Sequence, residues 1–286
     1  RCAAQVTMHN PFPYSDTNKR YHTFDYFLRH RFGGKVAKVS LDAGFTCPNI
    51  DGSKGVGGCT YCSAKGSGDF AGDKNLPLRD QFEQALCFPN AVGLAIATRA
   101  DCISNEVADY LGEIARRTYL EVELGLQTIH DATGERINRC HSYADFLTGY
   151  HKLRERGVNV CVHIIDGLPG ETHEMMLQTA QALSQLQLHS IKIHLLHLLK
   201  GTRMAEEYAR GEFALLSREE YVQIVCDQLE LLPPELVIQR LTGDGERESL
   251  IGPMWSLKKL VVMNEIDKEL ARRDSWQGRH FSPAHV

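Results

Sequence analysis

The stretch Val92-Gly-Leu-Ala-Ile-Ala-Thr98 is a short, almost wholly apolar run, and an amphipathic helical pattern at Glu106–Thr118 follows it. Going outward in both directions, the chain repeats this alternation of apolar run and helix. Parallel strands need a long crossover connection, which is usually a helix, so the alternation predicts a parallel α/β sheet. Runs with so few polar residues are typical of strands that are covered on both faces.

Five apolar runs are predicted to be strands of this sheet: Val36–Asp42, Val92–Thr98, Leu120–Thr128, Val158–Asp166 and Ser190–Leu199. Helices are predicted at Glu106–Thr118, Tyr143–Arg156 and Glu171–Leu186. In the tail, helices at Ser217–Leu231 and Ser256–Arg273 flank a further strand at Leu236–Leu241. The order fits a barrel or an open doubly wound sheet, and in both architectures ligands bind at the carboxyl ends of the strands.

The composition is that of an ordinary globular protein, with 286 residues, 43% of them hydrophobic and 24% charged, which argues against disordered and collagen-like chains. No apolar run approaches the roughly 18 residues that span a bilayer, so we expect no membrane association through a spanning helix. The N-terminus has no long apolar stretch, so no secretory signal is expected. The nine cysteines are an odd number in a long chain. They favour a reducing compartment, the cytoplasm, or an organelle if the N-terminus is a processed transit peptide.

The strongest chemical signal is the trio Cys47, Cys59 and Cys62, spaced C-x11-C-x2-C directly after the first predicted strand. Glycines in this loop let the backbone wrap closely around a bulky inorganic group. Thiolates bind both iron–sulfur clusters and structural zinc. No second Cys or His pair follows at zinc-finger spacing, which favours a [4Fe-4S] cluster with one iron open. A zinc loop with a distant fourth ligand is the alternative. A dinucleotide site at Gly66-Ser67-Gly68 is disfavoured because the third glycine is missing.

Several phrases along the chain, with the cysteine loop, resemble the YhcC/YtqA-type (MnmL) family of the radical S-adenosylmethionine (SAM) superfamily, which is related to the catalytic subunit of Elongator. The phrases are Ser40-Leu-Asp-Ala-Gly-Phe-Thr-Cys-Pro-Asn49, Gly57-Gly-Cys-Thr-Tyr-Cys62, Val122-Glu-Leu-Gly-Leu-Gln-Thr128, Gly167-Leu-Pro-Gly-Glu171, His194-Leu-Leu-His197, Gln239-Arg-Leu-Thr-Gly243 and Pro253-Met-Trp-Ser256. The resemblance implies an α/β fold, a partial (β/α)6-type radical SAM barrel at residues 36–200. A basic, aromatic segment at 1–35 would precede it, and a C-terminal α/β extension at 201–286 would follow.

The resemblance also implies roles for individual residues. Cys47, Cys59 and Cys62 would hold a [4Fe-4S] cluster whose open iron binds the amino and carboxylate groups of SAM. One-electron cleavage of SAM would then yield a 5′-deoxyadenosyl radical that takes a hydrogen atom from the substrate. The residues expected to contact SAM are Gly66, Gly68, Glu123, Gln127, Gly167 and Gly170. Two alternatives stay open: a strand-end salt bridge for Glu123, and an ordinary turn for Gly167-Leu-Pro-Gly170.

Lys192 and His194 lie two residues apart and therefore share one face of a predicted strand. We expect them to act in catalysis or to bind a carboxylate or phosphate; an internal polar network is the alternative. Asp166 stands where similar family members carry an uncharged residue. Asn138-Arg-Cys-His141 resembles a family Asn-Arg-Gly-His segment, and Cys140 in place of the glycine argues against a close backbone approach there.

Between Gln84 and Ala85 the family normally has a further helix–strand–helix stretch, which this sequence lacks. A barrel without its second strand would leave neighbouring strand edges unpaired. We therefore expect that roughly one βα unit, about 30 residues, belongs at this point and that Gln84 and Ala85 are not bonded to each other.

The substrate that the resemblance implies is tRNA, with conversion of 5-carboxymethylaminomethyluridine to 5-aminomethyluridine at the wobble position. A reductant such as ferredoxin or flavodoxin and a downstream methyltransferase would be partners. With a net charge of −4, the chain needs a local basic patch to bind RNA. Residues 18–40 carry a net charge of +5 with interleaved aromatic residues. The predicted RNA contacts are Lys19, Arg20, Arg29, Arg31 and Lys35, although aromatic residues at helical spacing also suit core packing.

Two other functions remain open at the level of sequence. The first is a radical SAM enzyme that acts on a small molecule or a protein, which salt-dependent tRNA binding would distinguish. The second is a non-catalytic metal-binding module, which would form no 5′-deoxyadenosine from SAM and a reductant.

Overall fold

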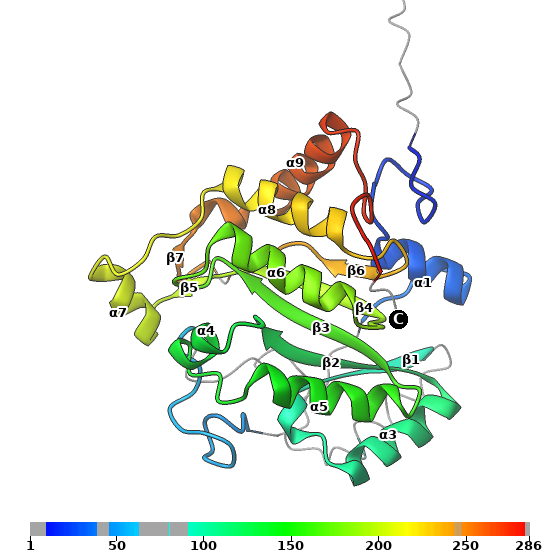
Figure 1. Ribbon diagram of the computed structural model, residues 1–286, viewed down its shortest axis with the longest axis horizontal. Coiled ribbons are helices and arrows are strands. Elements are labelled where there is room, and N and C mark those ends of the chain that lie inside the picture. Colours follow the sequence, from blue (N-terminus) through cyan, green and yellow to red (C-terminus); the bar gives the residue numbers. More distant parts are fainter. Residues whose placement is uncertain are drawn as a thin grey trace, which may run out of the picture.

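The computed structural model describes residues 10–38, 46–62, 80, 91–243, 245 and 247–283. Its main sheet has five parallel strands in the order β1-β2-β3-β4-β6 (Figure 1). These strands are β1 (Gly93–Thr98), β2 (Tyr119–Gln127), β3 (Asn159–Asp166), β4 (Ser190–Leu195) and β6 (Val237–Arg240). The prediction of a parallel α/β sheet is therefore confirmed. The main sheet also continues past the boundary expected at residue 200, because β6 pairs directly with β4.

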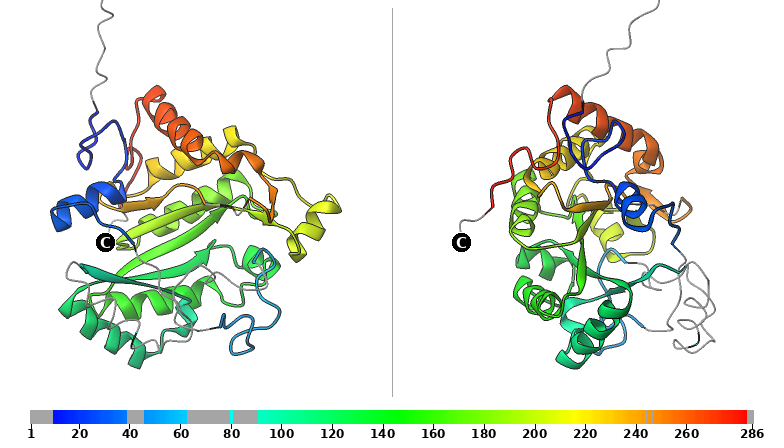
Figure 2. Two further views of the ribbon diagram at one scale, coloured as in Figure 1. Left: turned by 180° about the vertical axis from the view of Figure 1, so that it is seen from behind. Right: turned by 90° about the vertical axis from the view of Figure 1, so that its right-hand side faces the viewer.

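Crossover helices cover one face of this sheet. They are α3 (Asn105–Arg117), α5 (Tyr143–Arg154), α6 (His173–Ser184) and α8 (Arg218–Leu231), and α9 (Lys259–Arg272) packs against α8. The right-hand view in Figure 2 shows the green helices α5 and α6 on one side of the strands and the blue helix α1 (Phe24–Phe32) on the other. The shorter elements are α4 (Asp131–Arg136), α7 (Arg203–Ala209), two 3-10 turns (Ala100–Cys102 and Met254–Leu257), and an antiparallel pair formed by β5 (Leu198–Leu199) and β7 (Leu250–Gly252).

Strand alternation separates an apolar face from a polar one. Side chains such as Val122, Leu124, Val162 and Ile193 are fully buried in the main core. The residues between them point to the opposite face of the sheet. On that opposite face, which we call the inner face, β2 carries Glu121 and Glu123. Charged side chains in the interior need partners, so the inner face is where chemistry is to be sought.

The two ends of the described chain meet beside β6. Thr23 forms a parallel bridge with Ile238, and the Ile238 amide donates to the His22 carbonyl at 2.8 Å. Gln277, which is fully buried, fixes this junction: its side-chain carbonyl accepts from the His22 backbone amide at 2.8 Å, and its backbone amide donates to the Arg20 carbonyl at 2.9 Å. The N-terminal segment thus lies along the outer edge of β6, which it meets in a single bridge.

The limits of several strands and helices differ between the prediction and the structure. The run Ser190–Leu199 breaks after Leu195, and its last residues pair with β7 instead. The final helix begins at Lys259, because Met254–Leu257 forms a 3-10 turn. Residues 36–38 of the first predicted strand carry no strand, and its remaining residues, like the point between residues 84 and 85, lie outside the described part of the chain. Among the described helices, none combines the length and apolarity that crossing a membrane requires.

Candidate active site

The cysteine loop lies against the connection that follows β2. The Thr60 amide donates to the Ile137 carbonyl at 3.0 Å, and the Met204 amide of α7 donates to the Thr60 carbonyl at 3.1 Å. The side-chain amide of Asn138 donates to the carbonyl of Gly58 at 2.7 Å. Figure 1 shows the loop in light blue beside α4. The three cysteines therefore lie at the carboxyl edge of the sheet, where ligands of parallel α/β proteins bind.

The loop holds its thiols half-buried, and one of them is readily ionised. The Asn49 side-chain amide lies 3.5 Å from Cys59 Sγ. Hydrogen bonds from Cys62 and Asn49 outweigh the effect of burial and lower the pKa of Cys59 to about 6, while the pKa of Cys62 is raised. Iron–sulfur clusters bind thiolates, so an ionised sulfur at neutral pH suits this role.

The donor set of three cysteine thiols suits an iron–sulfur cluster. Among the described residues, no group of three or more His, Cys, Asp or Glu side chains is arranged to hold one metal ion. In a [4Fe-4S] cube, three cysteines bind three different iron atoms, so their sulfurs need not converge on one point. Gly57 and Gly58, with φ of 83° and 71°, turn the backbone in front of Cys59 in a way that residues with a Cβ atom rarely adopt.

A buried arginine fixes the segment that supports the loop. Arg139 is 1% exposed and donates to the carbonyls of Leu126 and Thr128 at the end of β2, and to that of His141. It also forms an ion pair with Asp131 at 3.0 Å. The sequence placed Arg139 in a family-like segment but gave it no role, because its acceptors are mostly backbone carbonyls that no sequence pattern reveals.

Cys140 occupies a backbone conformation that favours glycine. Its φ is 61°, which explains why the similar family segment carries glycine at this position. That Cys140 argues against a close approach by its own backbone stays a prediction; a Cβ atom on Gly55 would lie only 2.7 Å from Cys140 Sγ, so the cysteine side chain occupies the space between the two segments. The close approach is made by Gly55 of the cysteine loop, and the side chain of Cys140 fills the space beside it.

Glu123 is the centre of a charged group on the inner face. Its Oε2 accepts from Lys192 Nζ at 2.5 Å and from His163 Nε2 at 3.0 Å, and its Oε1 accepts from Lys38 Nζ at 3.0 Å. Burial alone would raise the pKa of Glu123, but the His163 hydrogen bond and the Lys192 ammonium lower it well below its usual range. The protein itself supplies the partners that a buried glutamate needs, so its burial requires no ligand. A SAM contact by Glu123 stays a prediction.

Glu121, two residues earlier on the same face, is held differently. It accepts from Ser190 Oγ at 2.7 Å and from Gln239 Nε2 at 2.5 Å, and burial raises its pKa. Neutral donors stabilise an ionised carboxylate less than ammonium groups do. The two glutamates therefore give the inner face two carboxyl groups with opposite pKa shifts.

The other predicted site residues fall into two places. His194 lies beside His163, with ring centroids 5.2 Å apart, and its Nε2 is buried with no hydrogen-bond partner in the described structure. At the carboxyl ends of the strands, Gln127, Gly167 and Gly170 have φ of 65°, 85° and 90°. Gly66 and Gly68 lie outside the described residues.

Asp166 is buried on the side of the sheet that faces the helices. Its Oδ1 accepts from Gln228 Nε2 of α8 at 2.8 Å, and its Oδ2 has no partner in the described structure. Burial raises the pKa of Asp166 to about 8. It therefore carries a proton at neutral pH, in keeping with the uncharged residue of similar family members.

The predicted RNA-contacting cations are mostly engaged within the protein. The prediction for Arg20 is wrong: this residue is 4% exposed and is bound to Asp274 and to the Ser275 carbonyl. Lys19 pairs with Asp267, and Arg29 pairs with both Asp16 and Asp25. Arg31 and Lys35 are exposed, with no ion pair to another described residue.

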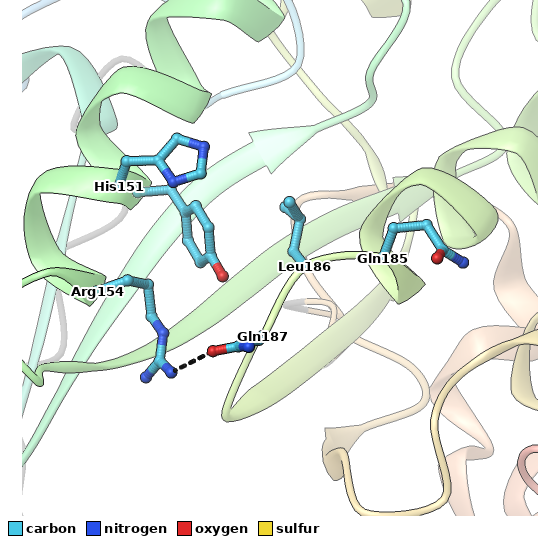
Figure 3. A pocket seen from close by; sticks show the side chains of 6 residues that line it. His151, Arg154, Gln185, Leu186 and Gln187 are labelled. Carbon is cyan, nitrogen blue, oxygen red and sulfur yellow. Dashed lines mark hydrogen bonds between the residues drawn. The ribbon is translucent and has the colours of Figure 1, made fainter. Parts of the chain in front are cut away.

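A surface pocket lies away from the cysteines (Figure 3). It has a volume of about 340 Å³ and is lined by Tyr150, His151, Arg154, Gln185, Leu186 and Gln187, with Arg154 donating to Gln187 at 3.3 Å. These residues precede β3 and β4, so the pocket lies at the amino edge of the sheet, opposite the cysteine loop. It contributes nothing to the candidate site.

Comparison with known proteins identifies the family of this chain. Residues 89–183 match the radical SAM superfamily domain, and residues 188–272 match the radical SAM C-terminal domain. The uncharacterised protein YtqA of Bacillus subtilis is 49% identical over 313 residues, covering 96% of this chain and 97% of YtqA. The alignment is longer than the chain itself, so it contains gaps in this chain. YhcC of Escherichia coli is 34% identical, covering 85% of this chain and 90% of YhcC.

More distant relatives share only part of their length with this chain. The tRNA uridine(34) acetyltransferase of Methanocaldococcus infernus is 29% identical over 157 residues, which are 54% of this chain and 29% of that protein. The structure of Elp3 from the same organism, with an N-terminal deletion, matches at a TM-score of 0.57 and 22% identity. The match covers 65% of this chain and 43% of Elp3, and it shows a shared fold. The chain belongs to the YtqA/YhcC family of radical SAM enzymes, which is related to Elongator and whose superfamily uses a [4Fe-4S] cluster and SAM.

Proposed function

We propose that this enzyme modifies the wobble uridine of tRNA, converting 5-carboxymethylaminomethyluridine to 5-aminomethyluridine. The observation that carries the choice of tRNA is the 157-residue similarity to a tRNA uridine(34) acetyltransferase. The cysteine loop at the carboxyl edge of the sheet and the charged inner face beside it supply the two parts that such a reaction needs. One part binds the cofactors, and the other receives a polar substrate group.

Cys47, Cys59 and Cys62 would hold the cluster in this proposal. When bound, the cluster and SAM supply a 5′-deoxyadenosyl radical that removes a hydrogen atom from the substrate. The chain's own residues orient these groups and exclude water. Asn49 stabilises the Cys59 thiolate, Arg139 fixes the supporting segment, and the turn from Gly167 to Gly170 offers backbone groups at the edge where the adenosyl part would lie.

The proposed reaction requires two other proteins, one that supplies an electron and one that acts on the product. Reduction of the cluster requires a one-electron donor of the ferredoxin or flavodoxin class. The product carries a primary amine, so a methyltransferase acting next would complete a methylaminomethyl group.

Two experiments test the function. Mass spectrometry of tRNA nucleosides from cells that lack this protein should show that 5-carboxymethylaminomethyluridine accumulates and that 5-aminomethyluridine is lost. The purified protein, reconstituted anaerobically with iron and sulfide, should then convert that tRNA in the presence of SAM and a reductant. An unchanged nucleoside profile in the deletion strain, together with no conversion by the reconstituted protein, would reject the tRNA reaction.

Cys102 offers a matched control for the ligand assignment. It is a half-buried cysteine outside the trio, on the 3-10 turn after β1. The Cys102→Ala variant should keep a full cluster and normal activity. Loss of the cluster in this variant would show that the set of ligands differs from the proposed trio.

A further inference from the structure

Two side chains on the inner face, Lys192 and His194, have hydrogen-bonding groups that the described residues leave unused. Lys192 is 8% exposed, and its ammonium group makes one hydrogen bond, to Glu123, which leaves two N–H groups without an acceptor among the described residues. His194 lies two residues further along β4 on the same face, and its Nε2 is buried without a partner in the described structure. Buried donors without acceptors cost free energy, so this arrangement is suited to an acceptor that arrives from outside.

The surroundings of these donors favour an anion. Lys38 and Lys192 both donate to Glu123, so two ammonium groups share one carboxylate at this point. Burial holds the pKa of His194 well below its usual value, and the neighbouring His163, Arg240 and Lys192 add to that shift. His194 therefore stays neutral and can offer an N–H to an anion beside cationic neighbours.

The depth of Lys192 below the edge of the sheet indicates which kind of anion can reach it. Lys192 lies three residues before Leu195, the last residue of β4, which is about 10 Å below the carboxyl edge at the usual rise of a strand. The phosphates of a polynucleotide lie on its outer backbone, whereas a base can extend a flexible side chain into such a site. The cysteine loop, where the proposed function places SAM, contacts the edge of the sheet instead.

We propose that Lys192 and His194 bind the carboxylate of the substrate's side chain, with Glu123 holding Lys192 in place. This inference rests on the proposed function, because a 5-carboxymethylaminomethyl group ends in such a carboxylate. The site distinguishes this group from the aminomethyl product, which has lost the carboxylate. The donors would thus determine specificity and favour release of the product.

The first test uses N-methylglycine, which carries the carboxymethylamine part of the side chain, and the full-length protein labelled with ¹⁵N-histidine. The His194 resonances are identified by their absence in the His194→Gln variant. N-methylglycine should shift them in a saturable way, and methylamine, which lacks the carboxylate, should not. Absence of a shift with N-methylglycine would overturn the proposal.

Substitutions of Lys192 and Glu123 should change the affinity for N-methylglycine in opposite directions. Lys192→Met removes a charged donor and should weaken N-methylglycine binding by about 10-fold or more. Glu123→Gln keeps a carbonyl oxygen that can hold Lys192 in place and removes the competing negative charge, so it should strengthen binding. The double variant, Glu123→Gln with Lys192→Met, removes both buried charges together, so it keeps the site neutral if the single variant does not fold. Lys268→Met, on the exposed surface of α9, is the control with unchanged affinity. Equal affinity in wild type and Lys192→Met, or in Glu123→Gln and the double variant, would overturn the proposal.

The second test separates the two possible sources of the carboxylate. SAM also has one, so SAM is added to the cluster-loaded protein before the titration. If SAM abolishes the N-methylglycine shift, the site belongs to the cofactor and the proposal falls. If the shift persists and the tRNA is not modified, the carboxylate site stands and the tRNA reaction is rejected. If the shift persists, Lys192→Met should raise the KM for carboxymethylaminomethyl tRNA about 10-fold, and an unchanged KM would count against the site.

Discussion

Replacing Asp166 by asparagine should make the stability of this protein less dependent on pH. The substitution keeps the size of the side chain and the acceptor for Gln228, and it removes the ionisable group. The pKa of Asp166 is about 8 in the folded protein, because the carboxyl is buried. In the unfolded chain an aspartate has a pKa of about 3.9.

The sign and size of the effect follow from these two values. Between about pH 4 and pH 8 the unfolded chain loses this proton while the folded protein keeps it. The free energy of unfolding of the wild type therefore falls as pH rises, by at most about 1.4 kcal/mol per pH unit from this group. The asparagine variant lacks this contribution. Its advantage over the wild type should grow by about 2–3 kcal/mol from pH 5 to pH 7 and level off above pH 8.

Urea unfolding of both metal-free proteins at pH 5, 6, 7 and 8, under anaerobic reducing conditions, measures this difference. All other titrating groups are shared, so their effects cancel when the two curves are subtracted. A difference that stays constant from pH 5 to pH 8 would refute the reasoning, because it would mean that Asp166 is ionised in the folded protein.

Four further predictions follow from the site and from the surface of the protein. Cys59→Ala should abolish cluster absorbance near 400 nm and SAM cleavage with an unchanged circular dichroism spectrum; retained SAM cleavage would reject its role as a ligand. Arg139→Met should lower the stability by about 3 kcal/mol, seen as a lower Tm, because buried acceptors lose their donor. Cys140→Gly should raise stability by about 0.5–1 kcal/mol, whereas an alanine at this position should not, because only glycine relieves the positive φ. Arg31→Gln combined with Lys35→Gln should weaken tRNA binding and reduce its log–log salt slope by about 1.5–2, and an unchanged slope would exclude phosphate contacts by these residues.

The strands and helices of the core could be predicted because their signals are local. The run Leu120–Thr128 alternates apolar and polar residues, and β2 occupies nearly the same residues. Helices begin where Ser142 and Ser217 cap them, and this side-chain chemistry can be recognised in sequence. The break after Leu195 could not be predicted, because the run stays apolar while its pairing changes from β3 to β7.

The sequence could predict which residues belong to the candidate site, but it could not predict which of them contact one another. Glu123, Lys192 and His194 were each expected at the site, but their grouping depends on the register of β2, β3 and β4, which no local pattern contains. For the basic segment at residues 18–40, the prediction of an RNA-binding surface failed for a different reason. Its net charge was counted over neighbouring residues, whereas Arg20 and Lys19 find their acidic partners some 250 residues away in the chain.

Gln277 has a consequence for the order in which this protein is completed. Its side chain also donates to the carbonyls of Pro233 and Leu236, so one amide group ties the N-terminal segment at His22 to the chain just before β6. During synthesis, His22 leaves the ribosome long before residue 277 exists. The junction beside β6 therefore lacks these hydrogen bonds until residue 277 has been made, and a nascent chain stalled before this point presents a less protected strand edge, which is prone to aggregation.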